Sequence, residues 1–334
     1  MTIGFRRTQR LSILCDRRAH DEAVEGLASF FADRQTRAGV VARQLLGIAH
    51  RDDDRLVAHL IRERRSKTRL DGSVDGSLRA TAWSAWELLR LGCSKGHAGL
   101  DRMVGFLVSR QDQPGRFGEG CSERRHAIAN CKHFMSGFFS PGSRDELIAP
   151  MVLPTQAVIV SEIAARFAIS CFALRSVLYA REERRDAVRR HIESLLTLSE
   201  RWRDRETEFP STVDVVFCAL GALGLAPPEY AEGVNRLTAR LGEMQNEEGV
   251  WEDTSIFHAL DGMLTLRSSA AREVIGRAMP RLLQMQQPSG GFDESQDEEL
   301  ALIALRALRT QAVTGSAPQL FQKLHPTAAR ERQR

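Results

Sequence analysis

A short pattern that recurs three times constrains the fold of this chain more than any other feature. Each copy consists of glutamine, three residues, glycine, one residue and an aromatic residue, and the copies lie at residues 111–117, 245–251 and 286–292. The last two copies begin 41 residues apart, because 286 − 245 = 41. Weaker copies are found at 71–78 and 202–211. A period of this length is typical of repeated supersecondary units that bury one another's apolar faces.

The segments between these turns have helical periodicity and alternate between two kinds. Helices that are apolar on one face are predicted to lie outside, and helices that are apolar on most sides to lie inside. The predicted outer helices are 21–35, 53–65, 100–110, 184–202, 232–244 and 272–285. The predicted inner helices are 38–49, 80–91, 157–180, 213–225, 255–266 and 300–308. Because strand alternation and hairpin dipeptides are nearly absent, we expect an all-α protein of six outer–inner hairpins closed into an α6/α6 barrel.

The same pattern suggests one domain with three additions. We expect an N-terminal extension at 1–20, the αα-barrel at 21–310 with an insertion at about 118–154, and a basic tail at 311–334.

A formal net charge of +4 without long blocks of one sign argues against nucleic-acid binding. The chain contains no run of about 18 apolar residues, so we expect no membrane span. Six scattered cysteines and no signal-peptide core predict a cytoplasmic protein, and the arginine-rich composition is typical of a GC-rich bacterial coding sequence.

The repeated turns resemble those of squalene cyclases and other class II terpene cyclases, and glycine-aromatic turns also occur in protein prenyltransferase β-subunits. The resemblance covers roughly 56–309, interrupted by 118–154. It implies a toroid whose central cavity binds an isoprenoid or another elongated apolar ligand, with prenyl diphosphate as one substrate class. It also implies that Gln111, Gln245 and Gln286 are structural, fastening outer helices to inner ones.

The chemistry of that superfamily is only partly present, so the enzymatic assignment stays open. The acid motif Asp-x-Asp-Asp is absent, and its nearest counterpart, 250–254, has Glu252 in the central place. Asp214, Cys218 and His258 match the zinc ligands of prenyltransferases in type but not in spacing. Aromatic residues are only 6% of the chain, which suits an extended apolar ligand better than successive carbocations. Prenyl transfer or cyclisation is one alternative; a non-catalytic toroid that binds a protein partner is the other.

Polar residues that interrupt the apolar helices are the candidate site. We expect the catalytic groups to be Asp214, Asp253 and His258, converging on one rim of the cavity. We expect the ligand-binding groups to be Glu162, Arg166 and Asp261. Two spacings leave a structural alternative open, since Glu162 with Arg166 and His258 with Asp261 are four and three residues apart and could form pairs.

A separate cluster in the insertion has the composition of a metal site. Cys121, His126, Cys131 and His133 are four thiolate and imidazole groups within thirteen residues, enough to complete a tetrahedral zinc site. Zinc is therefore the predicted cofactor. The alternative is that these residues fall together by chance and that the insertion packs over the mouth of the barrel.

Overall fold

The computed structural model describes residues 2–111, 137–142, 147–201 and 213–312. These residues form twelve α-helices, one short 3-10 helix and one pair of two-residue strands, which confirms the all-α class. The helices are α1 (Thr2–Phe31), α2 (Arg37–Leu46), α3 (Asp53–Ser66), α4 (Leu78–Arg90), α5 (Ala98–Ser109), α7 (Glu162–Tyr179), α8 (Asp186–Arg201), α9 (Val213–Leu223), α10 (Ala231–Glu243), α11 (Ile256–Met263), α12 (Ser269–Gln284) and α13 (Glu298–Ala312).

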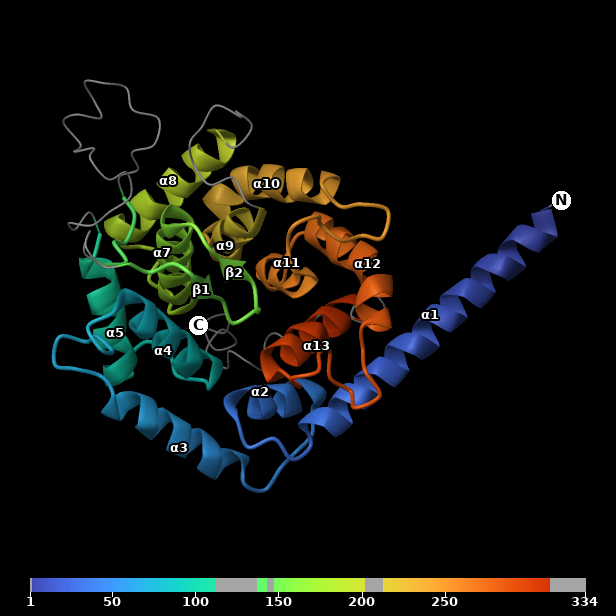
Figure 1. The fold of residues 1–334 in the computed structure, drawn as a ribbon, viewed down its shortest axis with the longest axis horizontal. Coiled ribbons are helices and arrows are strands. Elements are labelled where there is room, and N and C mark those ends of the chain that lie inside the picture. The colour runs from blue at the N-terminus through green and yellow to red at the C-terminus, as the bar shows by residue number, and fades with distance from the viewer. Residues whose placement is uncertain (1, 112–136, 143–146, 202–212, 313–334) are drawn as a thin grey trace, which may run out of the picture.

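One series of helices carries most of the core. Helices α2, α4, α7, α9, α11 and α13 contact one another in that order, and α13 also contacts α2. They begin within a few residues of the positions predicted for inner helices, apart from α7. Their buried residues lie on most sides, as in α9, where seven of the eleven residues are buried. We refer to these six as the inner helices; Figure 1 shows them following one another around the centre of the molecule.

The remaining helices, α1, α3, α5, α8, α10 and α12, lie around the periphery in Figure 1. Over the residues whose burial is described, each of them buries at most one face. In α10 the buried positions are Val234, Leu237, Thr238 and Leu241, which recur every three or four residues and so form one stripe along the helix. Helix α3 has no fully buried residue. We call these six the outer helices.

The glutamine of each repeat fastens neighbouring outer helices to each other. Gln245 donates from Nε2 to the carbonyl of Val274 in α12 (3.0 Å), and Gln286 donates to the carbonyl of Ala23 in α1 (3.0 Å). Gln111 donates in the same way to the carbonyl of Ala187 in α8 (2.6 Å). The expected outer-to-inner fastening is therefore made by a different residue of the repeat: Trp251 packs edge-on against Phe217 of α9 while its indole N–H donates to the carbonyl of Leu241 in α10.

A small hairpin lies between the inner helices and departs from the sequence prediction. Strands β1 (Met151–Val152) and β2 (Val158–Ile159) pair antiparallel, and α7 begins only at Glu162, although we expected one helix over 157–180. A short apolar run has no periodicity that separates a buried helix from a strand. Residues 153–157 form the turn, closed by a hydrogen bond from the Leu153 amide to the Ala157 carbonyl (2.9 Å). In Figure 1 the hairpin lies beside α7 and α9, and its turn extends toward the centre of the inner helices.

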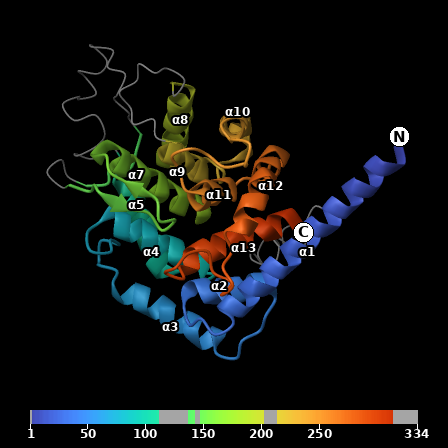
Figure 2. The ribbon, with the colours of Figure 1, turned by 45° about the vertical axis from the view of Figure 1, so that its right-hand side comes forward.

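The N-terminal helix leaves the rest of the molecule. Helix α1 is continuous from Thr2 to Phe31 and so includes most of the segment that the sequence suggested as an extension. In Figures 1 and 2 its first half projects away from the other helices, whereas its last turns lie against them. Within the described segments, no helix combines the length and the apolar character needed to cross a membrane.

Candidate functional site

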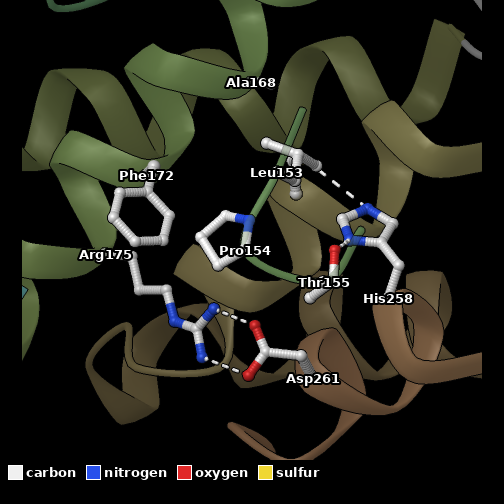
Figure 3. A pocket seen from close by; sticks show the side chains of 9 residues that line it. Leu153, Pro154, Thr155, Ala168, Phe172, Arg175, His258 and Asp261 are labelled. Atoms are coloured by element: carbon white, nitrogen blue, oxygen red, sulfur yellow. Dashed lines mark hydrogen bonds and ion pairs between the residues drawn. The ribbon is translucent and has the colours of Figure 1, made fainter. Parts of the chain in front are cut away.

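The candidate site is a small cavity beneath the turn of the hairpin. It has a volume of about 40 Å³, room for a few water molecules only. Helices α7, α9 and α11 form its walls, and the hairpin turn forms its remaining side (Figure 3). The lining residues are Leu153, Pro154, Thr155, Ala168, Phe172, Arg175, Cys218, His258 and Asp261. The walls are thus mainly apolar, with a few polar groups pointing into one space.

His258 is buried at the start of α11 and uses both ring nitrogens. Nε2 lies 2.8 Å from the carbonyl oxygen of Asp214, and Nδ1 lies 3.0 Å from the hydroxyl of Thr155. Because a carbonyl can only accept, Nε2 carries the proton and Nδ1 accepts from Thr155. Burial lowers the pKa of His258, and the nearby Asp214 opposes this only in part, so the ring is neutral at pH 7. If Thr155 moved away, the Nδ1 lone pair of the neutral ring would become available, while the Asp214 carbonyl would still hold the ring in place.

The thiol of Cys218 completes the surroundings of that ring, with Sγ 3.7 Å from Nε2 of His258. Of the three residues that match prenyltransferase zinc ligands in type, Cys218 and His258 approach each other through their side chains, whereas Asp214 meets His258 only through its backbone carbonyl. Burial raises the pKa of the Cys218 thiol strongly, so the group is a neutral thiol in this environment. Within the described residues, no cluster of three or more histidine, cysteine or acidic side chains is placed to hold a metal ion.

Asp261 forms an ion pair at the base of the cavity. Its carboxylate receives two hydrogen bonds from Arg175 (2.5 and 3.1 Å) and one from Arg306 (3.2 Å), as Figure 3 shows for Arg175. Burial alone would raise the pKa of Asp261, but Arg175 and Arg306 outweigh it and hold the pKa far below its ordinary value. Asp261 therefore stays ionised and turns toward the two arginines instead of pairing with His258.

The other predicted site residues lie elsewhere. Glu162 and Arg166 form the expected pair (2.7 Å), and Glu162 also accepts from the amides of Ile148 and Ala149, so it anchors the segment that leads into β1. Asp253 is exposed in the repeat turn with a φ of 60°. Neither this residue nor the Glu162–Arg166 pair lines the cavity.

Asp214 contributes to the site through its backbone. Its carboxylate accepts from the hydroxyl of Thr254, while its carbonyl orients His258. Of the predicted site residues, His258 and Asp261 therefore line the cavity, and Asp214 adjoins it through the carbonyl that binds His258.

Two contributors to the cavity were missed in the sequence. Arg175 lies in the apolar string of α7, where an isolated arginine is the expected partner of a buried acid such as Asp261. An acid within an apolar helix, such as Asp261, needs a basic partner, and this requirement is the signal that points to Arg175. Thr155 carries no such signal, because only the fold of the hairpin brings it to His258.

The predicted zinc ligands Cys121, His126, Cys131 and His133 lie outside the described residues. The zinc site therefore stays a prediction.

Comparison with known proteins gives a likeness of fold. No protein-family model matches this sequence. No curated protein matches it either. The structure is similar to the crystal structure of a protein from Actinoplanes, with a TM-score of 0.52 and 13% sequence identity over 88% of this chain and 99% of that one. At this identity the likeness shows a shared fold only.

Proposed function

We propose that this chain is an α6/α6 toroid that binds an elongated apolar ligand of isoprenoid type at the centre of its inner helices. The ordered contacts among the inner helices, with α13 returning to α2, support a closed ring. The ligand occupies the space that the hairpin turn fills in the present conformation. Binding therefore requires the turn at 153–157 to withdraw.

The observation that carries this proposal is how the centre is filled. Leu153 and Pro154 of the turn lie against Ala168 and Phe172 of α7, so a loop occupies apolar space that the helices do not fill themselves. Sites for small molecules are usually several hundred cubic ångströms in volume, far more than the present 40 Å³. Displacing a loop is less costly than opening a core of interlocked helices, because loops have fewer buried contacts.

The outer surface of the hairpin supports an apolar ligand as well. Eight large hydrophobic residues are exposed on the described part of the chain, and five of them fall within residues 147–163: Leu147, Val152, Val158, Val160 and Ile163. Val152 and Val158 face each other across the two strands, on the side opposite the buried Met151 and Ile159. Scattered exposed apolar residues are ordinary, but their concentration in the hairpin and its flanking residues is typical of a site that receives an apolar molecule.

For a catalytic version of this function, we assign the role of general base to His258. With Thr155 withdrawn, Nδ1 is free to take a proton from a carbocation formed in prenyl transfer or cyclisation, while the Asp214 carbonyl holds the ring through Nε2–H. The apolar wall opposite, which includes Phe172, would exclude water from that ion.

A fluorescent farnesyl analogue tests the binding proposal directly. We expect saturable binding to the wild type and loss of binding in Phe172→Trp, which fills the cavity. Thr155→Val removes the bond to His258, favours the open turn and so should tighten the apparent affinity. Thr68→Val, at a half-buried position outside the cavity lining, serves as the matched control and should bind like the wild type. The proposal fails if the wild type does not bind the analogue, or if Phe172→Trp and Thr155→Val both bind like the control.

A non-catalytic scaffold is the second candidate, and the closed centre favours it. Both nitrogens of His258 are hydrogen-bonded and Asp261 is paired with two arginines, as expected of core structure. Substituting His258 with alanine separates the candidates. A ligand site predicts loss of probe binding with nearly unchanged helical circular dichroism, whereas a structural histidine predicts loss of helix with probe affinity unaltered in the folded fraction.

Zinc in the insertion is a proposal that metal analysis can decide. If Cys121, His126, Cys131 and His133 bind the ion, purified protein contains about one equivalent of zinc, and Cys131→Ala reduces it because a thiolate ligand is lost. Cys93→Ala, far from the insertion in sequence, is the control. Equal zinc content in both variants would rule out this site.

A further inference from the structure

A cluster of arginines adjoins the Arg175–Asp261 pair that lines the cavity. Arg175 (α7) and Arg306 (α13) both bind the carboxylate of Asp261. Arg90 is the last residue of α4 and is hydrogen-bonded to Tyr179 at the end of α7. The charge of Arg90 is the strongest electrostatic influence on Arg306, so the two guanidinium groups are near neighbours. We call Arg90, Arg175, Arg306 and Tyr179 the arginine cluster.

The charges of this cluster are not balanced within the described residues. The adjacent Arg37 and Arg64 are matched by Glu87 and Glu299, with which they form ion pairs. The cluster itself has three arginines and a single carboxylate, Asp261. The carbonyl ends of α4 and α7, where Arg90 and Tyr179 lie, offset part of the excess through the helix dipole.

Unused hydrogen-bond donors point to a missing partner. Nε of Arg90 and Nε of Arg175 are buried and have no hydrogen-bond partner in the described chain. A buried guanidinium N–H without an acceptor destabilises the folded state, because it has lost its hydrogen bonds to water. Such donors are satisfied when a water or a ligand lies between them.

The pKa of Tyr179 is shifted by the same excess of positive charge. Burial by itself would raise the pKa of its phenol, but Arg90 and Arg306 outweigh burial and lower it. Burial and the charge of Arg90 likewise lower the pKa of Arg306 to about 10. The cluster is reachable from solvent, since Arg90, Tyr179 and Arg306 are each only partly buried.

We propose that the arginine cluster binds a dianionic, tetrahedral phosphate group, either as inorganic phosphate or as the phosphate of a small ester. The match is one of charge and geometry. Three arginines against one carboxylate leave an excess of two positive charges, and guanidinium groups bind phosphate oxygens through paired N–H donors. The site lies beside the apolar cavity but is independent of any apolar ligand there.

Calorimetric titration with inorganic phosphate, at constant ionic strength set by sodium chloride, tests the proposal. We expect saturable binding of phosphate to the wild type, about ten- to a hundredfold weaker binding in Arg90→Gln and Arg306→Gln, and no change in Arg51→Gln, whose arginine is exposed. Glycerol 3-phosphate in a second titration identifies the source, because tighter binding of the ester indicates a small phosphate ester as the ligand. Absence of saturable phosphate binding, or equal affinity in all variants, overturns the proposal.

The phenol of Tyr179 supplies a readout that needs no arginine variant. The chain has two tyrosines, and Tyr230→Phe leaves Tyr179 as the only one. Bound phosphate cancels positive charge beside the phenol, so it should raise the pH at which the phenolate absorbance appears. Sodium chloride at the same ionic strength should not. An unchanged Tyr179 titration in saturating phosphate would place the anion elsewhere and refute the assignment.

Discussion

At the scale of single residues, Arg43 illustrates how a buried charge can tie the start of the chain together. Its side chain is 1% exposed. It donates to the carbonyls of Phe31 (2.7 Å) and Arg34 (2.9 Å) and forms an ion pair with Asp53 at the start of α3. One guanidinium therefore joins α1, the loop after it and α3.

We expect Arg43→Met to lower the free energy of unfolding by about 3 kcal/mol, because it removes the partner of Asp53 and of the backbone carbonyls that Arg43 binds. Arg79→Met, at an exposed position, should change it by less than about 0.5 kcal/mol. Urea denaturation of the three proteins measures the difference. Similar losses in both variants would contradict a special role for the buried arginine.

The sequence indicated which residues are polar within apolar helices, but it did not indicate their partners. Arg166 pairs with Glu162 as its spacing predicts, because four residues correspond to one helical turn. Asp261 instead pairs with Arg175, 86 residues away, and His258 with Thr155, 103 residues away. Such contacts depend on how separate helices meet, which no local spacing contains.

At the scale of elements, the repeat turn depends on close approach between a glycine and the following outer helix. Gly249 has a φ of 75°, and a Cβ built on it would lie 2.0 Å from the carbonyl oxygen of Arg277 in α12. Gly47, after α2, offers a matched comparison: its φ is 74°, but a Cβ there would meet nothing within 4 Å. The two glycines share a backbone conformation and differ only in their surroundings.

Alanine substitution should therefore separate strain from crowding. Gly47→Ala should cost about 1 kcal/mol of stability, from the left-handed conformation alone. Gly249→Ala should cost about 3 kcal/mol or more, because α12 must also move away. Thermal unfolding of both variants measures the gap. Equal losses would mean that the turn does not hold α12 in place.

The helices and turns were the most predictable part of this molecule. The repeat and the two kinds of helical periodicity placed α10 and α12 to within about three residues, since both signals are local. The hairpin was missed because strands of two residues carry no measurable alternation. Its turn fills the candidate site, so the least predictable element determines the size of the cavity.

At the scale of the whole molecule, a buried histidine makes stability depend on pH. His191 in α8 packs between Phe138 and Phe139, with ring centroids 4.7 Å apart in each case. Burial lowers its pKa to about 3, whereas the unfolded chain protonates it near pH 6.5. Between these values the unfolded state binds the extra proton, so the free energy of unfolding falls as the pH falls below about 6.5.

The expected slope from His191 is about 1.4 kcal/mol per pH unit. His191→Leu should remove that contribution between pH 6.5 and 5, above the range in which most carboxylates titrate. His59→Gln, an exposed control, should retain it. Denaturation curves at several pH values measure the slopes. Parallel pH profiles for wild type and His191→Leu would argue that the histidine is not buried neutral.

The contacts between the first and the last helices have a consequence for biosynthesis. Helices α1 and α2 contact α12 and α13, which the ribosome makes more than 200 residues later. Translation proceeds at about 5–20 residues per second, so α13 is synthesised on the order of ten seconds or more after α2. During that interval the nascent protein exposes the apolar surface of α2 that α13 later covers. We therefore expect chains halted before α13 to be captured by chaperones, and release of the final repeat to be the step that completes folding.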